Sequence, residues 1–185
     1  MPPGMVNIRP RVGMYAAFAR LNYKPWFAIS EFIDNSIQSF LDHREALGPQ
    51  LEVEVKLDEG QIQIVDRAAG IRPQDFPRAF SPSQPPPDRS GLSEFGLGMK
   101  AAACWFARQW SVRTTALGDP VERTISFNVP EIASKGLEHL QVRERPVADG
   151  EHYTVVTMSE LRNRPKGRTV TKIKDHLASI YRVLL

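Results

Sequence analysis

Residues 26–40 read WFAISEFIDNSIQSF, and the interpretation of the whole chain starts from this stretch. Its apolar residues recur at spacings of three and four, which predicts an amphipathic helix from Pro25 to about residue 46. Glu31 and Asn35 are four residues apart and therefore share one face of that helix. A carboxylate can activate a water molecule, and an amide oxygen can bind a hard cation such as Mg²⁺. Alone, the pair also fits an ordinary solvated helix face.

The composition is that of a single soluble globular domain. The chain has 185 residues, of which 42% are apolar and 24% are charged, so one core is expected over residues 1–185. No apolar run has the length of a membrane span, and the N-terminus lacks the apolar core of a signal peptide. The single cysteine, Cys104, excludes an internal disulfide framework. These features predict a cytoplasmic protein with no membrane partner.

The predicted elements follow the order helix, hairpin, loop, helix and further strands. Residues 12–21 predict a short helix, and the alternation in 51–57 and 61–65 predicts a β-hairpin. A Pro-rich loop at 80–91 precedes a predicted helix at 97–107. Short helices are also expected at 73–79 and 131–136, strands at 109–117, 121–128 and 152–158, and a final helix at 171–185. This order fits an α+β two-layer sandwich, with helices on one face of a mixed, mostly antiparallel sheet.

The segment SEFGLGMK, residues 93–100, places two glycines and a lysine at the start of a predicted helix. Gly96 and Gly98 let a backbone approach an anion closely, and a helix N-terminus presents free N–H groups. Lys100 adds a positive charge in the first turn. Residues 91–96 have the glycine spacing of a P-loop, but neither Lys-Ser nor Lys-Thr follows and no strand precedes them. The segment therefore predicts a polyphosphate cradle that is not a P-loop.

Asp66 stands at the end of the second predicted strand and is followed by RAAG, residues 67–70. Its carboxylate could accept a hydrogen bond from an exocyclic amine such as that of adenine. Gly70 would let the chain turn tightly beneath the base. An ordinary turn residue is the alternative for Asp66.

Together these segments resemble the GHKL ATPase superfamily, which includes DNA gyrase B, the MutL mismatch-repair proteins, histidine kinases and the ninety-kilodalton heat-shock chaperone. Its pattern is E-x-x-x-N, D-x-G-x-G, a lid, a G-x-G segment and a strand threonine. Here the pattern reads EFIDN (31–35), DRAAG (66–70), a loop at 72–94, FGLGMK (95–100) and YTVVT (153–157). The resemblance covers nearly the whole chain and implies the Bergerat fold. Within the superfamily, EFIDNS and FGLGMKAA are most similar to the MORC-like ATPases, which act in chromatin and in bacterial restriction or defence.

The resemblance implies a role for each motif residue, with ATP and Mg²⁺ as the ligands. Glu31 would be the general base that activates the attacking water, and Asn35 would coordinate Mg²⁺. Asp66 would read the adenine amine with support from Thr154, either directly or through a water molecule, and Gly70 would form the floor of the base pocket. The phosphates would lie on Gly96, Leu97, Gly98, Met99 and Lys100.

The resemblance also implies how the protein works. The chain would be the ATP-binding domain of a longer MORC-like protein that binds Mg²⁺-ATP and hydrolyses it slowly. The family's catalytic lysine usually comes from a following transducer domain, so weak or no turnover is expected from residues 1–185 alone. ATP binding would close a lid, residues 72–94, and promote homodimerisation through an N-terminal strap, residues 1–24.

Two other functions stay open at this point. One is a non-catalytic, ATP-gated binding module. The other is an ATP-binding domain of the histidine-kinase type, against which Glu31 argues because phosphotransfer needs no water-activating base.

The sequence departs from the superfamily pattern at Ala68, which stands where the middle glycine of D-x-G-x-G is usual, and Arg67 replaces a commonly uncharged neighbour. A methyl group at position 68 is tolerable if the backbone φ is negative and costly if φ is positive. Nucleotide affinity therefore depends on the backbone at Ala68.

Residues 161–174 carry six basic residues and no acidic one, an excess larger than the net charge of +3 of the whole chain. Such a run forms either a solvated face or a contact with the phosphate backbone of DNA. The solvated face is the commoner case, and DNA is the partner that the second alternative implies for residues 161–174.

Overall fold

The structure is a computed structural model that describes residues 12–81 and 97–181. Its helices are α1 (Met14–Phe18), α2 (Pro25–Asp42), α3 (Arg44–Leu47), α4 (Phe76–Phe80), α5 (Gly98–Phe106), α6 (Val129–Lys135) and α7 (Arg168–Ile180), with a 3₁₀ turn η1 (Pro73–Asp75) before α4. Its strands are β1 (Val53–Leu57), β2 (Gln61–Asp66), β3 (Ala107–Thr115), β4 (Val121–Asn128), β5 (Val142–Pro146) and β6 (Tyr153–Leu161).

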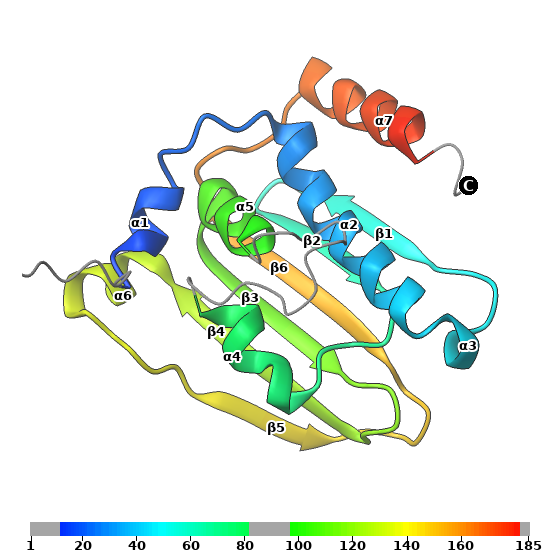
Figure 1. Ribbon diagram of the computed structural model, residues 1–185. Coiled ribbons are helices and arrows are strands. Elements are labelled where there is room, and N and C mark those ends of the chain that lie inside the picture. The colour runs from blue at the N-terminus through cyan, green and yellow to red at the C-terminus, as the bar shows by residue number, and fades with distance from the viewer. Residues whose placement is uncertain (1–11, 82–96, 182–185) are drawn as a thin grey trace, which may run out of the picture.

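The strands form one sheet, and the helices α1, α2, α4 and α5 cover one of its faces (Figure 1). The strand order is β1-β2-β6-β3-β4-β5, and every pairing among the described strands is antiparallel. The last strand, β6, therefore inserts between β2 and β3. The predicted α+β two-layer architecture is confirmed, with a sheet that is antiparallel throughout its described part.

The core lies between the helix layer and the sheet. The predicted apolar stripe of α2 is buried at Ile29, Ile33 and Ile37. Helix α5 is buried at seven of its nine residues, which explains why its sequence is apolar on all sides except at Lys100. From the sheet, the ring of Trp110 stacks on that of Phe127 with 3.7 Å between the centroids.

The segment predicted as a strap, residues 1–24, is described from residue 12 onward. There α1 packs inside the chain, because Tyr15 and Phe18 are buried in the core. The Tyr15 hydroxyl donates a hydrogen bond to the carbonyl oxygen of Phe80 at the end of α4. The described part of the segment thus contributes to the core of its own chain, and dimerisation through residues 1–24 stays a prediction.

The structure corrects three of the predicted elements. The continuous helix to about residue 46 is wrong: His43, with φ −128° and ψ 20°, separates α2 from α3. The final helix begins at Arg168, earlier than predicted. Strand β5 was not predicted, because its sequence VRERP has no apolar alternation, and four of its five residues are exposed at the edge of the sheet.

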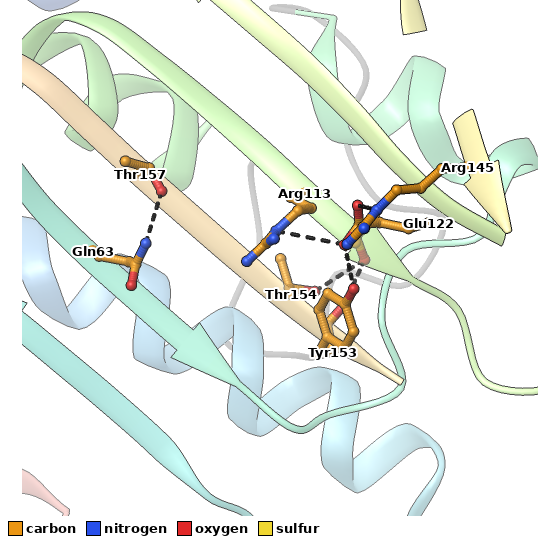
Figure 2. A network of polar contacts seen from close by, with 8 residues as sticks. Gln63, Arg113, Glu122, Arg145, Tyr153, Thr154 and Thr157 are labelled. Carbon is orange, nitrogen blue, oxygen red and sulfur yellow. Dashed lines mark hydrogen bonds and ion pairs between the residues drawn. The ribbon is translucent and has the colours of Figure 1, made fainter. Parts of the chain in front are cut away.

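A charged cluster links β5 to the sheet on the face opposite the helices (Figure 2). Glu122 of β4 is only 3% exposed there, and Arg145 of β5 donates two hydrogen bonds to its carboxylate. The Tyr153 hydroxyl donates another, and Arg113 Nε lies 3.6 Å from Glu122 Oε2. The hydrogen bonds from Arg145 are the largest cause that lowers the pKa of Glu122 below its ordinary value. The cluster therefore holds the edge strand through a buried carboxylate.

We expect Glu122→Gln to lower the free energy of unfolding at about pH 7 by about 1 kcal/mol, since hydrogen bonds to a charged acceptor are lost. The pKa of Glu122 is lower in the folded state than in the unfolded state. Its contribution is therefore present above the unfolded pKa and is lost as pH falls through the folded pKa. Denaturant unfolding should show that the difference in the free energy of unfolding between the wild type and the variant disappears in acid. Glu144→Gln, which alters an exposed ion pair with Arg123, is the matched control. A gap that is equally large in acid contradicts this role of Glu122.

Candidate functional site

A cavity of about 770 Å³ lies between the helix layer and the sheet, with walls from α2, β2, β6, α4 and the start of α5. All described residues of the predicted site line it: Glu31, Asn35, Asp66, Gly70, Leu97, Gly98, Met99, Lys100 and Thr154. Gly96 lies outside the described residues. The fold therefore brings together motifs that are more than a hundred positions apart in the sequence.

Glu31 lies against the first residue of α5. A Cβ atom built on Gly98 would be 1.8 Å from Oε2 of Glu31, so the carboxylate takes this place only beside a glycine. Burial raises the pKa of Glu31, the nearby charge of Asp34 raises it further, and a hydrogen bond from Tyr23 opposes the rise. A carboxylate with a raised pKa is a stronger base than one in water. The position suits proton abstraction next to a helix N-terminus.

Asn35 lies one helical turn after Glu31 on the cavity side of α2. Its Nδ2 donates a hydrogen bond to the backbone carbonyl of Glu31 at 2.7 Å, which orients the amide. The described residues contain no group of three His, Cys, Asp or Glu side chains that could hold a metal ion. Asn35 Oδ1 together with oxygens of the nucleotide is one set of donors that a cation in this cavity could use. That donor set fits Mg²⁺, which commonly takes one or two protein ligands together with substrate phosphates.

Asp66 is buried at the end of β2 and held from two sides. The Ser36 hydroxyl donates to Oδ2 at 2.8 Å, and the backbone N–H of Ala68 donates to Oδ1 at 3.0 Å. Burial raises the pKa of Asp66, and these hydrogen bonds act against that rise. Both oxygens keep lone pairs that could accept further hydrogen bonds.

Apolar side chains line the cavity beside Asp66. They are Phe32, Ile64, Ala69, Ile71, Leu117 and Val156. The part of the cavity lined by these side chains and by Asp66, here called the apolar slot, fits a flat heteroaromatic ring that carries an exocyclic amine.

Both the backbone conformation and the close packing at position 70 require a glycine. Its φ is +69°, and a Cβ atom there would lie 2.0 Å from the carbonyl oxygen of Thr115. At Ala68 no such strain exists, because Glu160 is the one non-glycine residue with positive φ in the described part of the chain. The backbone φ of Ala68 is therefore not positive, and its methyl group is tolerated.

Lys100 is buried to 1% exposure, and its ammonium group is directed toward the end of α4. Nζ donates to the carbonyl oxygens of Arg78 and Ala79, at 3.0 Å in each case. Burial is the main cause that lowers the pKa of Lys100 to about 8, and the charge of Arg78 adds to it. These two hydrogen bonds use two of the three ammonium protons, and the predicted phosphate contact stays a prediction.

Sequence reasoning missed several residues of the cavity wall. Ser36 follows Asn35 directly, but only the fold reveals its partner Asp66, thirty positions later. Arg72 and Arg78 lie at the cavity with their guanidinium groups 2.9 Å and 3.5 Å from the Asp75 carboxylate. No motif marks these side chains, because their partners are set by the turn from η1 into α4.

Other predicted segments are described in part. Of the predicted lid, 72–94, residues 73–80 form η1 and α4, and residues 82–94 lie outside the described part. The basic side chains of 161–174 are exposed: Arg162, Arg164, Lys166, Arg168, Lys172 and Lys174. DNA contact through them stays a prediction. None of the described helices combines the length and the apolar character needed to cross a membrane.

Comparison with protein families agrees with this geometry. The sequence model described as "Histidine kinase-, DNA gyrase B-, and HSP90-like ATPase" matches residues 23–164. This span includes every described residue of the predicted site, whereas α7 lies beyond it. A search among curated proteins finds no match to the chain.

We expect Gly70→Ala to destabilise the fold by about 2 kcal/mol or more, because the new methyl group meets the Thr115 carbonyl and φ is positive. Gly118→Ala is the matched control, since Gly118 has φ +77° and no atom within 4 Å of the added Cβ. Gly118→Ala should lower the free energy of unfolding by only about 1 kcal/mol, because it changes the backbone preference without a steric clash. Denaturant unfolding measures both, and equal losses would show that the close approach at Gly70 is unimportant.

Proposed function

The chain belongs to the histidine kinase-, DNA gyrase B- and HSP90-like ATPase family, and we propose that it is a Mg²⁺-dependent ATPase that acts in the cavity beside α2. Family membership implies ATP binding. The finer assignment to the MORC-like ATPases is proposed from the motifs EFIDNS and FGLGMKAA.

One observation carries this proposal. The carboxylate of Glu31, the amide of Asn35 and the buried carboxylate of Asp66 line the same cavity, with the N-terminus of α5 beside Glu31 and the apolar slot beside Asp66. One cavity thus holds both the groups for charged chemistry and the groups for base recognition, as the two ends of a nucleoside triphosphate require.

The same arrangement suggests how ATP would bind. The base would enter the apolar slot, where the Asp66 carboxylate accepts a hydrogen bond from its exocyclic amine. The phosphates would lie toward Gly98 at the start of α5. The first turn of a helix has free N–H groups that can bind an anion. Asn35 would hold a Mg²⁺ ion at this end of the cavity, where the ion would supply positive charge to offset that of the phosphates.

Hydrolysis would then depend on Glu31. Its carboxylate takes a proton from a water molecule as the water oxygen bonds to the γ-phosphorus. The bond between that phosphorus and the β–γ bridging oxygen breaks, and ADP and inorganic phosphate leave. Because burial raises the pKa of Glu31, the carboxylate is a stronger base once it has lost its proton. The rate should therefore rise with pH through the raised pKa of this group.

We also propose that ATP binding moves the segment 72–94 as a lid and favours a homodimer through residues 1–24. The contact between Lys100 and the end of α4 supports the first idea, because it joins the phosphate-binding helix to the start of the lid. In the alternative function, a non-catalytic, ATP-gated module, ATP would bind in the same way, but Glu31 would not act as a general base.

Asn35→Ala should lower the affinity for ATP in the presence of Mg²⁺ by at least about tenfold, since the protein ligand of the ion is lost. Calorimetric titration of the 185-residue chain with ATP, with and without Mg²⁺, measures this effect. Ser39→Ala, on the same helix and the same cavity wall, is the control and should bind like the wild type. Unchanged Mg²⁺-dependent affinity in Asn35→Ala would refute the assigned role.

Glu31→Gln should keep ATP affinity within about threefold and lower single-turnover hydrolysis by at least about a hundredfold, because a carboxamide cannot take the proton. Asp42→Asn removes another carboxylate of the cavity wall on α2 and should hydrolyse ATP normally. Phosphate release that persists in Glu31→Gln would contradict the role as base. Because weak or no turnover is expected from residues 1–185 alone, this test uses the longer MORC-like protein that the resemblance implies. A wild type of that protein that binds ATP but releases no phosphate would favour the non-catalytic module.

A further inference from the structure

A row of three polar side chains crosses the sheet at the base end of the cavity. Asp66 of β2 is paired with Thr154 of β6, and Thr154 is paired with Thr114 of β3. Thr154 lines the cavity next to Asp66, whereas Thr114 stands behind it and is only 2% exposed. Tyr153 and Thr154 lie side by side at the start of β6 (Figure 2).

The hydrogen bonds of Thr114 determine where its proton points. A threonine hydroxyl has one proton to donate and two lone pairs to accept with. Oγ1 of Thr114 accepts from the backbone N–H of Ile71 at 2.9 Å. It also lies 2.9 Å from the carbonyl oxygen of Tyr153, which can only accept, so the Thr114 proton is directed there. One lone pair of Thr114 then remains for Thr154.

The direction of the next hydrogen bond follows. Oγ1 of Thr154 lies 3.2 Å from Oγ1 of Thr114, and Thr154 donates in this pair because the Thr114 proton is already used. With its only proton turned away from the cavity, Thr154 offers the ligand lone pairs alone. The oxygens of the Asp66 carboxylate beside it accept hydrogen bonds from Ser36 and from the backbone of Ala68, and they keep lone pairs for a ligand. The polar edge of the base slot therefore consists of acceptors.

We propose that Thr114 is a positioning residue that fixes Thr154 as a hydrogen-bond acceptor and so makes the site select a 6-aminopurine over a 6-oxopurine. This inference rests on the proposed ATP-binding function. The adenine amine has two protons, which Asp66 and Thr154 can accept. A 6-oxo group brings lone pairs to the same place, and buried acceptors that face each other lose their hydrogen bonds with water.

Inosine triphosphate is the probe, because it replaces the 6-amino group of ATP by oxygen and changes nothing else outside the purine ring. Calorimetry with Mg²⁺ should show that the wild type binds ATP at least about tenfold more tightly than inosine triphosphate. Thr114→Val releases the Thr154 proton, which can then be donated to the 6-oxo group. The ratio of the two affinities should fall by about fivefold, the value of one hydrogen bond. Thr114→Ser keeps the hydroxyl and should keep the ratio.

A purely structural role for Thr114 would weaken the binding of both nucleotides equally and leave their ratio unchanged. Should Thr114→Val fail to fold, Thr154→Val tests the same point, because it removes the acceptor and leaves the bonds of Thr114 to Ile71 and Tyr153 in place. In Thr154→Val, too, the ratio of the affinity for ATP to that for inosine triphosphate should fall. An unchanged ratio in the folded variant overturns the proposal for Thr114, as does a wild type that binds ATP without discrimination. Binding of neither nucleotide by the wild type overturns the ATP-binding proposal together with this inference.

Discussion

The hydrogen bond from the Ser36 hydroxyl to the Asp66 carboxylate, 2.8 Å long, joins the helix layer to the sheet at the bottom of the cavity. Ser36 is 3% exposed and Asp66 is 7% exposed, so the bond forms away from water, where an unpaired carboxylate would be costly. Ser36 is also the residue after Asn35. The bond therefore fixes the position of the proposed metal ligand on α2 relative to the proposed base-reading group on β2.

Two close approaches by glycine define the ends of the same cavity. Gly98 admits the Glu31 carboxylate to the start of α5, and Gly70 lets the chain after β2 press against the carbonyl of Thr115. At Gly70 an added side chain would meet the backbone, so this close approach is fixed by the main chain, whereas at Gly98 it would meet the carboxylate of Glu31. Lys100 then connects α5 to α4 through two carbonyl oxygens, which places a buried cation between the proposed phosphate site and the start of the proposed lid.

What the sequence predicted correctly was local. The periodicity of α2, the alternation in β1 and β2, and the glycines at the start of α5 each reveal an element without knowledge of its neighbours. Strand β5 was missed because Arg145 is held by Glu122, a residue on another strand. Thr114 was missed for the same reason, since its partners come from a loop and from β6. The effect of Ala68 depended on a backbone angle that composition does not reveal.

A crystal structure of the 185-residue chain with Mg²⁺ and a non-hydrolysable ATP analogue tests most directly whether one cavity holds both ends of the nucleotide. The predicted result has the adenine amine within hydrogen-bond distance of the Asp66 carboxylate, Mg²⁺ bound to Asn35 Oδ1, and the γ-phosphate facing Glu31 beside Gly98. A nucleotide bound outside this cavity, or one with its base directed away from Asp66, would contradict the assignment.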